Sequence, residues 1–189
     1  MDRFVLARVW HRSQSWPGQR SRDDIAARRL GDRRKANPKM QLEYEMTFHE
    51  RIEGPLGPTT GAPAHLVWQI AEASLTGPRI SATLAMAGTD WIRLGNDGIR
   101  RQDQRAQFLT DDGVLILLRY DTGLIRGDNK FLDALQKGEE TSFGDQYMFM
   151  VPQFEVASDR YDWLTRSVFL AQGRLAGRKQ IEYAVHRVA

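Results

Sequence analysis

Residues 99–109 form a run of charged and amide side chains whose types and spacing could do chemistry. Asp103 and Arg105 are two positions apart, so both point to the same face if this segment is a β-strand. A carboxyl whose pKa is raised by partial burial can accept or donate a proton. A guanidinium offers fixed hydrogen-bond donors to a carboxylate, a phenolate or a developing oxyanion. We predict Asp103 as a proton-transfer group and Arg105 as an anion binder; the alternative is a structural ion pair that only fixes strand register.

Neighbouring segments carry side chains that could complete such a site. Tyr120 ends an alternating apolar face and would supply a phenol as a hydrogen-bond partner. Asp90 and Trp91 are adjacent in sequence, so only one of them can face the interior of a sheet. Tyr161 and Trp163 precede another strand-like segment. Aromatic walls with a few polar groups are typical of a site for a small, flat, apolar ligand, and equally of a barrel core.

The elements that must position these residues are predominantly strands. From residue 40 onward the dominant hydrophobic period is two, and Gly-, Pro- and Asp-rich turns interrupt it. The pattern predicts strands at residues 42–49, 65–74, 79–87, 90–94, 99–109, 114–120, 146–151, 164–172 and 180–188. Residues 128–137 form the one predicted helix, with Asp128 as its N-cap and Gly138 as its stop.

About eight or nine strands with turns every 8–12 residues indicate an all-β sandwich or a closed antiparallel barrel. We favour the closed barrel because closure removes exposed edge strands. A barrel of about eight strands has an interior just wide enough for side chains or for one small ligand. The predicted fold is therefore an all-β closed antiparallel barrel with one short helix.

The positive charge of this 189-residue chain is concentrated in residues 1–39. These hold 11 Lys and Arg against 4 Asp and Glu, whereas residues 40–189 hold 16 against 20. We predict a basic, disordered extension at 1–39 and a barrel domain at 40–189. A transit peptide and an upstream start codon before Met40 are the alternative accounts of the extension. Because the barrel domain is mildly acidic, we expect no nucleic-acid partner.

Several chemistries lack support in the residue types. The chain has no cysteine, and its four histidines form no HxH or HExxH pair, so we predict no metal site. No GxSxG, GxxxxGK[ST] or strand-linked GxGxxG motif occurs, which argues against serine hydrolases, P-loop enzymes and dinucleotide cofactors. No secretory apolar core and no run of about 18 apolar residues is present, so we expect a cytoplasmic protein without a membrane partner.

Seven short motifs, in order, cover roughly residues 40–188. They are Gly77-Pro78-Arg79, Asp90-Trp91, Asp97-Gly98, Asp103-Gln104-Arg105, Thr110-Asp111-Asp112-Gly113, Pro152-Gln153-Phe154-Glu155 and Tyr161-Asp162-Trp163-Leu164. With these motifs the chain resembles the bacterial family called domain of unknown function 3237, also known as UPF0311. The resemblance implies a lipocalin-like closed barrel, similar to that of allene oxide cyclase. It implies no established reaction.

The sequence departs from that family's usual pattern at three places. Glu72 and Ala73 stand near a usual Gly-Gly, Ala82 stands at a usual Gly, and Thr165 stands at a usual Asn. Glu72 is thus an unusual carboxylate on a predicted strand, either a specialised acid/base or ligand-binding group or an outward, solvated residue. The missing Asn amide puts any site chemistry shared with the family in doubt.

Three hypotheses follow from these observations. The first is a cofactor-free barrel that binds a small aromatic or apolar molecule, with an isomerisation, cyclisation or lyase step catalysed by acid/base residues in the lumen. The second is a non-catalytic carrier or sensor that uses the same cavity. The third is a structural module with a filled core that assembles as a homo-oligomer.

Overall fold

The computed structural model describes residues 39–57 and 63–189. The elements in chain order are β1 (Leu42–Leu56), β2 (Ala64–Gly77), β3 (Ile80–Leu94), β4 (Arg100–Thr110), β5 (Leu115–Arg126), α2 (Asn129–Lys137), β6 (Tyr147–Met150), β7 (Gln153–Val156), η2 (Asp159–Leu164), β8 (Phe169–Leu175) and β9 (Gln180–Val188). The predicted basic extension lies, apart from Lys39, outside the described residues and stays a prediction.

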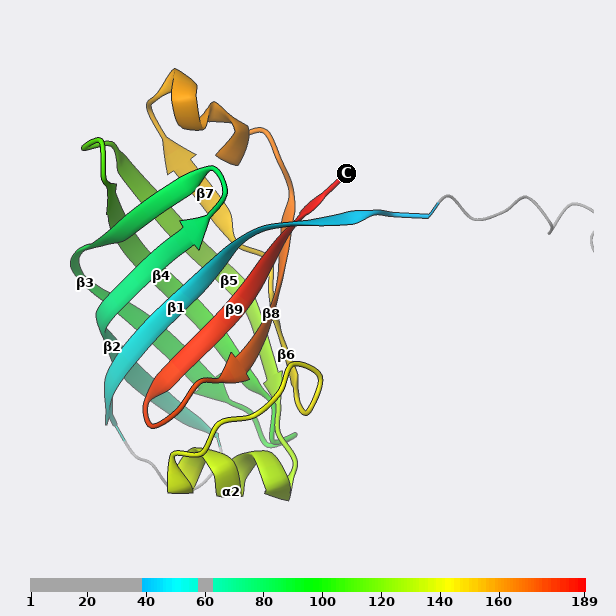
Figure 1. Cartoon of the computed structure of the whole chain (residues 1–189). Coiled ribbons are helices and arrows are strands. Elements are labelled where there is room, and N and C mark those ends of the chain that lie inside the picture. Colours follow the sequence, from blue (N-terminus) through cyan, green and yellow to red (C-terminus); the bar gives the residue numbers. More distant parts are fainter. Residues whose placement is uncertain (1–38, 58–62) are drawn as a thin grey trace, which may run out of the picture. The chain divides into compact units, whose positions relative to one another are not determined.

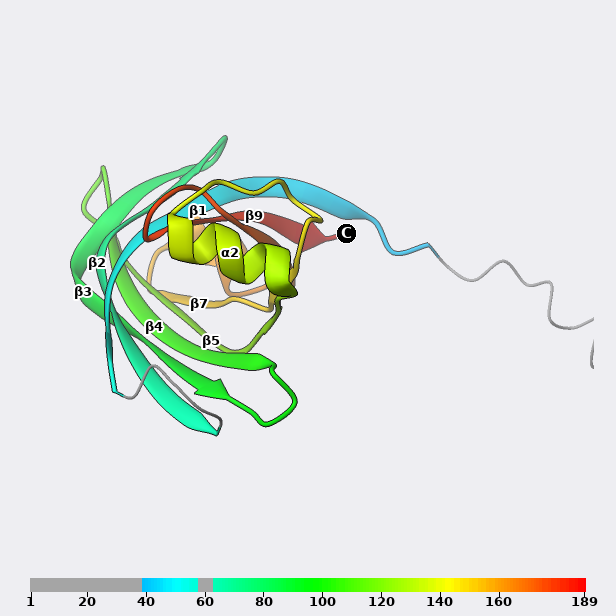
Figure 2. The same ribbon diagram turned by 90° about the horizontal axis from the view of Figure 1, so that it is seen from below.

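The strands form a closed antiparallel barrel, as predicted (Figure 1). The sheet runs in the order β4-β3-β2-β1-β9-β8-β6-β5, and pairing between β4 and β5 closes the ring. The additional strand β7 pairs with β5 beside β6. Helix α2 lies across one end of the barrel (Figure 2). Closure leaves the eight ring strands with a neighbour on both sides, which removes long exposed edges.

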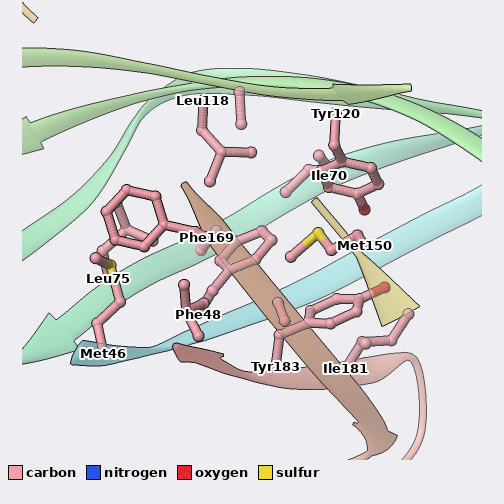
Figure 3. Close-up of a cluster of buried hydrophobic side chains, with 14 of the residues drawn as sticks. Met46, Phe48, Ile70, Leu75, Leu118, Tyr120, Met150, Phe169, Ile181 and Tyr183 are labelled. Carbon is pink, nitrogen blue, oxygen red and sulfur yellow. The ribbon is translucent and has the colours of Figure 1, made fainter. Parts of the chain in front are cut away.

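Alternating side chains of the strands fill most of the interior with apolar groups. Phe48 of β1 stacks on Tyr183 of β9, with ring centroids 5.7 Å apart, and meets Phe108 of β4 edge to face at 5.9 Å. Figure 3 shows Phe48, Met46 and Leu75 within this cluster, all of them fully buried. Burial of these side chains is the main stabilising contribution to the barrel.

Helix α2 has the ends that the sequence predicts. The Asp128 carboxylate accepts a hydrogen bond from the backbone N–H of Phe131, and Gly138 ends the helix with a left-handed φ of 74°. Both α2, with nine residues, and η2, with six, are too short to span a bilayer, and no other helix in the described part of the chain could do so.

Strands β1 and β5 run on to Leu56 and Arg126, past their predicted ends at 49 and 120, and three further differences concern the number or type of elements. The two segments predicted at 79–87 and 90–94 are one strand, β3, because Gly88 and Thr89 sit in a bulge rather than a turn. Strand β7 was not predicted, and it has only four residues. The segment predicted as a strand from residue 164 begins as the 3-10 helix η2, so β8 starts only at Phe169.

Candidate active site in the barrel interior

A layer of six polar side chains interrupts the apolar interior of the barrel. Each of the six residues is at most 2% exposed to solvent. They are Glu50 of β1, Asp90 of β3, Gln102 and Gln104 of β4, Tyr120 of β5 and Tyr183 of β9. Buried polar groups are costly unless they are hydrogen-bonded, so this layer requires an internal network of partners.

Strand β4 is the centre of the layer. Gln102 and Gln104 are two residues apart and therefore share its inward face. In the strand register, Gln104 pairs with Asp90 on β3 and with Tyr120 on β5. The antiparallel pairing thus brings carboxyl, amide and phenol groups together across three adjacent strands.

Two parallel hydrogen-bond chains each end on a carboxyl group. In one chain, the Tyr120 hydroxyl donates to Oε1 of Gln104, and Nε2 of Gln104 donates to Oε2 of Glu50 at 2.9 Å. In the other, the Gln102 amide lies 3.4 Å from the Tyr183 hydroxyl, and its Nε2 donates to Oδ2 of Asp90 at 2.9 Å. Each glutamine therefore orients one carboxyl group.

The second oxygen of each carboxyl group has no partner. Glu50 Oε1 and Asp90 Oδ1 are buried and make no hydrogen bond to any described residue. Leaving a buried acceptor unpaired costs about 1–3 kcal/mol, so such atoms indicate either a functional role or a partner that binds there. A ligand with an O–H or N–H group could supply the missing donor to either oxygen.

The environment holds both carboxyl groups near their titration point at neutral pH. Burial, with the charge of Asp90 added, raises the pKa of Glu50 to about 8, although the Gln104 hydrogen bond opposes the shift. Burial raises the pKa of Asp90 to about 7, against the hydrogen bond from Gln102. Such values suit general acid/base catalysis, because each group can both hold and release a proton at neutral pH.

The phenols of the layer remain protonated. Burial raises the pKa of Tyr120 and that of Tyr183 well above the ordinary value of 10. Figure 3 shows both hydroxyls at the same end of the interior cluster, away from Met46 and Leu75. They are therefore neutral hydrogen-bond donors beside the carboxyl pair.

The placement predicted for Asp103 and Arg105 is wrong. Both lie on the outward face of β4, where Arg105 is exposed and Asp103 half-buried. The opposite face carries Gln102 and Gln104 inward. Neutral amides are cheaper to bury than ions, so the strand buries Gln102 and Gln104 fully and places Asp103 and Arg105 on its outer face. Arg100, at the start of the inward face, is only half-buried.

The structure also settles which of two adjacent residues on β3 faces inward. Asp90 is 2% exposed and lies in the polar layer, whereas Trp91 is 56% exposed on the outer wall. Glu72 also points outward, where its carboxylate accepts a hydrogen bond from Arg51 at 2.7 Å. Of the residues predicted from sequence, only Asp90 and Tyr120 come together in the interior layer.

Tyr161 and Trp163 belong to a different part of the molecule. Both lie in η2, where the Tyr161 hydroxyl donates to Asp112 at 2.9 Å. The Trp163 ring packs against Phe169 and is covered by the Arg79 guanidinium, 3.8 Å from its centroid. Neither residue contributes a polar contact to the carboxyl pair.

Four residues of the layer were not predicted from the sequence, although each has a recognisable position on an alternating strand face. Glu50 has the same strand parity as Phe48 and Ile52, so a carboxylate interrupts an otherwise apolar face. Tyr183 occupies the apolar face of β9. Gln102 and Gln104 occupy the second face of the segment at 99–109, which is also polar near its middle.

The carboxyl pair does not resemble a metal centre. In residues 39–57 and 63–189, no group of three or more His, Asp or Glu side chains is placed to hold a metal ion. The polar layer offers two carboxyl groups with amide and phenol partners, a set of groups that moves protons and donates hydrogen bonds.

Comparisons with known proteins agree with the barrel. The family described as "Protein of unknown function (DUF3237)" matches residues 38–188. The UPF0311 protein blr7842 of Bradyrhizobium diazoefficiens is 26% identical over 153 residues, which are 80% of this chain and 98% of that protein.

Solved structures share the same fold. RPA1785 from Rhodopseudomonas palustris, a conserved protein of unknown function, superposes with a TM-score of 0.72 at 22% identity, over 81% of this chain and 100% of that one. A beta-barrel like protein (ABAYE2633) from Acinetobacter baumannii gives 0.65 at 26% identity, over 82% and 100%.

A more distant likeness is an enzyme from Penicillium herquei, with a TM-score of 0.59 at 16% identity, over 82% of this chain and 98% of that one. At this identity the likeness concerns the fold alone. The family match over residues 38–188 covers every strand of the barrel, from β1 to β9. This chain therefore belongs to the DUF3237 family, and curated relatives of the chain are named UPF0311 proteins.

Proposed function

We propose that this protein binds a small aromatic or otherwise apolar molecule inside the barrel and transfers a proton within it, as isomerases, cyclases and lyases do. The acid/base groups are side chains of the lumen, and the proposal requires no cofactor. One observation carries it: Glu50 and Asp90 are buried together, each with one unpartnered oxygen. A carboxyl pair of this kind is costly to the fold and suited to proton transfer.

The different environments of the two carboxyl groups assign their roles. The negative charge of Asp90 raises the pKa of Glu50, so Glu50 keeps its proton while Asp90 is ionised. In this state Asp90 is the general base and Glu50 the general acid. Carboxyl groups whose environments separate their pKa values are typical of acid/base pairs in enzymes.

The proposed step conserves protons and electrons. The Asp90 carboxylate takes a proton from a carbon beside a carbonyl group, while protonated Glu50 donates its proton to the carbonyl oxygen. The C–H electron pair becomes the new C=C bond of an enol, and the carbonyl π pair binds the incoming proton. Where the enol is conjugated with a further C=C bond, Asp90 returns its proton to the far carbon of that bond and the double bond shifts toward the carbonyl carbon. The hydroxyl proton returns to Glu50 as the C=O bond re-forms, which completes an isomerisation.

The surrounding groups support this chemistry. Gln102 and Gln104 fix the orientation of the two carboxyl groups, which reduces the reorganisation needed in the transition state. Ile70, Phe48 and Met150 supply apolar surface in the same interior. The Penicillium herquei protein with this fold is described as an enzyme, which is compatible with catalysis on such a scaffold.

The test is proton exchange on enolisable probes. Phenylacetone and 2-cyclohexenone are incubated with the full chain in D2O at pH 7.5, and loss of the α-proton signals is followed by NMR. We expect exchange above the buffer rate, and a decrease of about 10²-fold or more in Glu50→Gln and in Asp90→Asn. Asp121→Asn, an exposed carboxylate next to Tyr120 on β5, is the matched control and should exchange like the wild type.

A second measurement keeps the proposal testable if the probes fit poorly. Carbon-13 NMR titration of the carboxyl groups should place Glu50 and Asp90 well above the other acids. Exchange that persists in both variants, or ordinary pKa values for both groups, would overturn the proposal. Probe binding without exchange in the wild type would instead favour the carrier hypothesis.

A further inference from the structure

A cleft of about 430 Å³ opens on the outer wall of the barrel, over β3, β4, β5 and β7. Its volume is within the range of small-molecule sites, about 300–1,000 Å³. The lining side chains that matter here are Met86, Arg105, Leu117, Arg119 and Glu155. Arg105 and Leu117 belong to outward-facing positions, so this cleft is separate from the carboxyl layer, and the inference does not rest on the proposed function.

The bulge in β3 creates the cleft. Register with β4 shifts twice, between Leu84 and Met86 and between Met86 and Thr89. Strands β3 and β4 approach each other closely at Gly88, where a Cβ atom would lie only 2.8 Å from the carbonyl oxygen of Arg105. A side chain at position 88 would therefore collide with β4 beneath the cleft. Bulges commonly occur next to functional sites, where they redirect side chains and end regular pairing.

Two arginines occupy directly paired strand positions in this cleft. Arg105 on β4 is the register partner of Arg119 on β5, and both line the cleft. Like charges directly opposite each other across two strands are destabilising. An anion that binds between the two groups would relieve this repulsion.

The acidic residues nearby balance this charge only in part. Arg119 Nε lies 3.6 Å from Oε1 of Glu155, and both side chains are more than half exposed, so the ion pair is weak. Arg105 forms no ion pair with any residue of the described ranges 39–57 and 63–189. The cleft therefore carries an excess positive charge.

The same cleft carries exposed apolar surface beside the cations. Met86 is 59% exposed and Leu117 is 37% exposed, and both line the cleft. We propose that this cleft binds a small organic carboxylate with a short apolar body. Arg105 and Arg119 hold the carboxylate oxygens through charge-assisted hydrogen bonds, and Met86 and Leu117 contact the apolar part.

Binding of octanoate to the full chain tests this proposal, measured by calorimetry and by backbone amide shifts at Gly88, Arg105 and Arg119. Acetate and octan-1-ol each carry half of the required chemistry, so both should bind at least tenfold more weakly than octanoate. The double variant Arg105→Gln/Arg119→Gln should raise the Kd for octanoate at least tenfold. Arg93→Gln, an exposed arginine further along β3, is the matched control and should leave the Kd unchanged.

Three outcomes would overturn the proposal. The first is no shift of the cleft amides at 10 mM octanoate, and the second is an equal loss of affinity in Arg93→Gln. The third is inorganic phosphate binding as tightly as octanoate, which would remove the role of the apolar surface. Because the double variant removes a like-charge pair, it should fold at least as stably as the wild type, and its thermal midpoint verifies this.

Discussion

The negative charge of Asp90 on β3 raises the pKa of Glu50 on β1, in addition to the larger effect of burial. The two carboxyl groups therefore titrate as an interacting pair, although 40 residues separate them in the chain. Each is held by a glutamine from β4, at 2.9 Å in both cases. Charge, burial and strand register together make this pair the most perturbed pair of acids in the described part of the chain.

Removing the charge of one partner should change the titration of the other. In Asp90→Asn, the pKa of Glu50 should fall below its value of about 8, because the repulsion by Asp90 is gone. It should remain above the ordinary 4.5, because burial persists. Carbon-13 NMR of the Glu50 side-chain carboxyl measures the change, with Asp121→Asn as the control. An unchanged pKa in Asp90→Asn would show that the two charges do not interact.

Stability should decrease as pH rises through the neutral range. Glu50 and Asp90 have ordinary pKa values of 4.5 and 3.8, and the fold raises them to about 8 and about 7. Between these limits the folded chain binds more protons than the unfolded chain, so the free energy of unfolding falls as pH increases. Each pKa unit corresponds to about 1.4 kcal/mol, so the loss between pH 5 and pH 8 should reach several kcal/mol.

Urea denaturation at pH 5, 6, 7 and 8 measures this dependence. Glu50→Gln, which imitates the protonated acid, should flatten the profile and be the more stable form at pH 8. Acids with a lowered pKa, such as Asp97, contribute in the opposite direction, but only at pH values below their ordinary range. A wild-type profile that matches the Glu50→Gln profile would contradict the expectation.

A second ionic cluster should stabilise the fold at one edge of the β1–β9 pair. Glu45 is 6% exposed and accepts hydrogen bonds from Arg79 at 2.7 Å and from Arg187 at 2.9 Å. Burial acts to raise the pKa of Glu45, but these hydrogen bonds outweigh it and lower that pKa. Glu45→Gln should reduce the free energy of unfolding by about 1.5–3 kcal/mol, the range for hydrogen bonds to charged groups.

Chemical denaturation at pH 7 provides the measurement for Glu45→Gln. The comparison is Asp97→Asn, which removes an exposed ion pair with Arg101 and should change stability much less. Because a lowered pKa stabilises the ionised form, the contribution of Glu45 should be lost as pH falls through that lowered pKa. Equal effects of the two substitutions would mean that burial adds nothing to the Glu45 cluster.

The barrel could be predicted from sequence because hydrophobic alternation and turn residues recur along the whole domain. The inner face of β4 could not be predicted in this way. Both faces of residues 99–109 are polar near the middle, and a period of two does not show which of the two faces is buried. The deciding factor is the cost of desolvation, which is lower for Gln102 and Gln104 than for Asp103 and Arg105. A ranking of the two faces by that cost would have placed the amides inside.

The carboxyl pair needed information that no local pattern contains. Glu50 and Asp90 lie on strands separated in the sheet by β2, so the pattern of neither strand indicates that their charges interact. The break predicted at Gly88-Thr89 shows a similar limit, because a glycine within an alternating pattern is compatible with a turn or with a bulge. Only pairing with β4 makes this position a bulge.

The polar layer should be sensitive to one added methyl group at Gly123 on β5. A Cβ atom there would lie 2.7 Å from Cβ of Gln102 and 2.9 Å from Cε2 of Tyr120, so both side chains must move. Overpacking of this kind typically costs about 1–3 kcal/mol, and we expect that loss of stability for Gly123→Ala. The Gln102 hydrogen bond lowers the pKa of Asp90, so its displacement should raise that pKa further. Denaturation measures the loss of stability, and carbon-13 titration measures the pKa of Asp90. The control is Asp121→Ala, an exposed site on the same strand, which should change neither quantity. A Gly123→Ala variant that is as stable as the wild type and leaves the Asp90 pKa unaltered would show that the layer repacks freely.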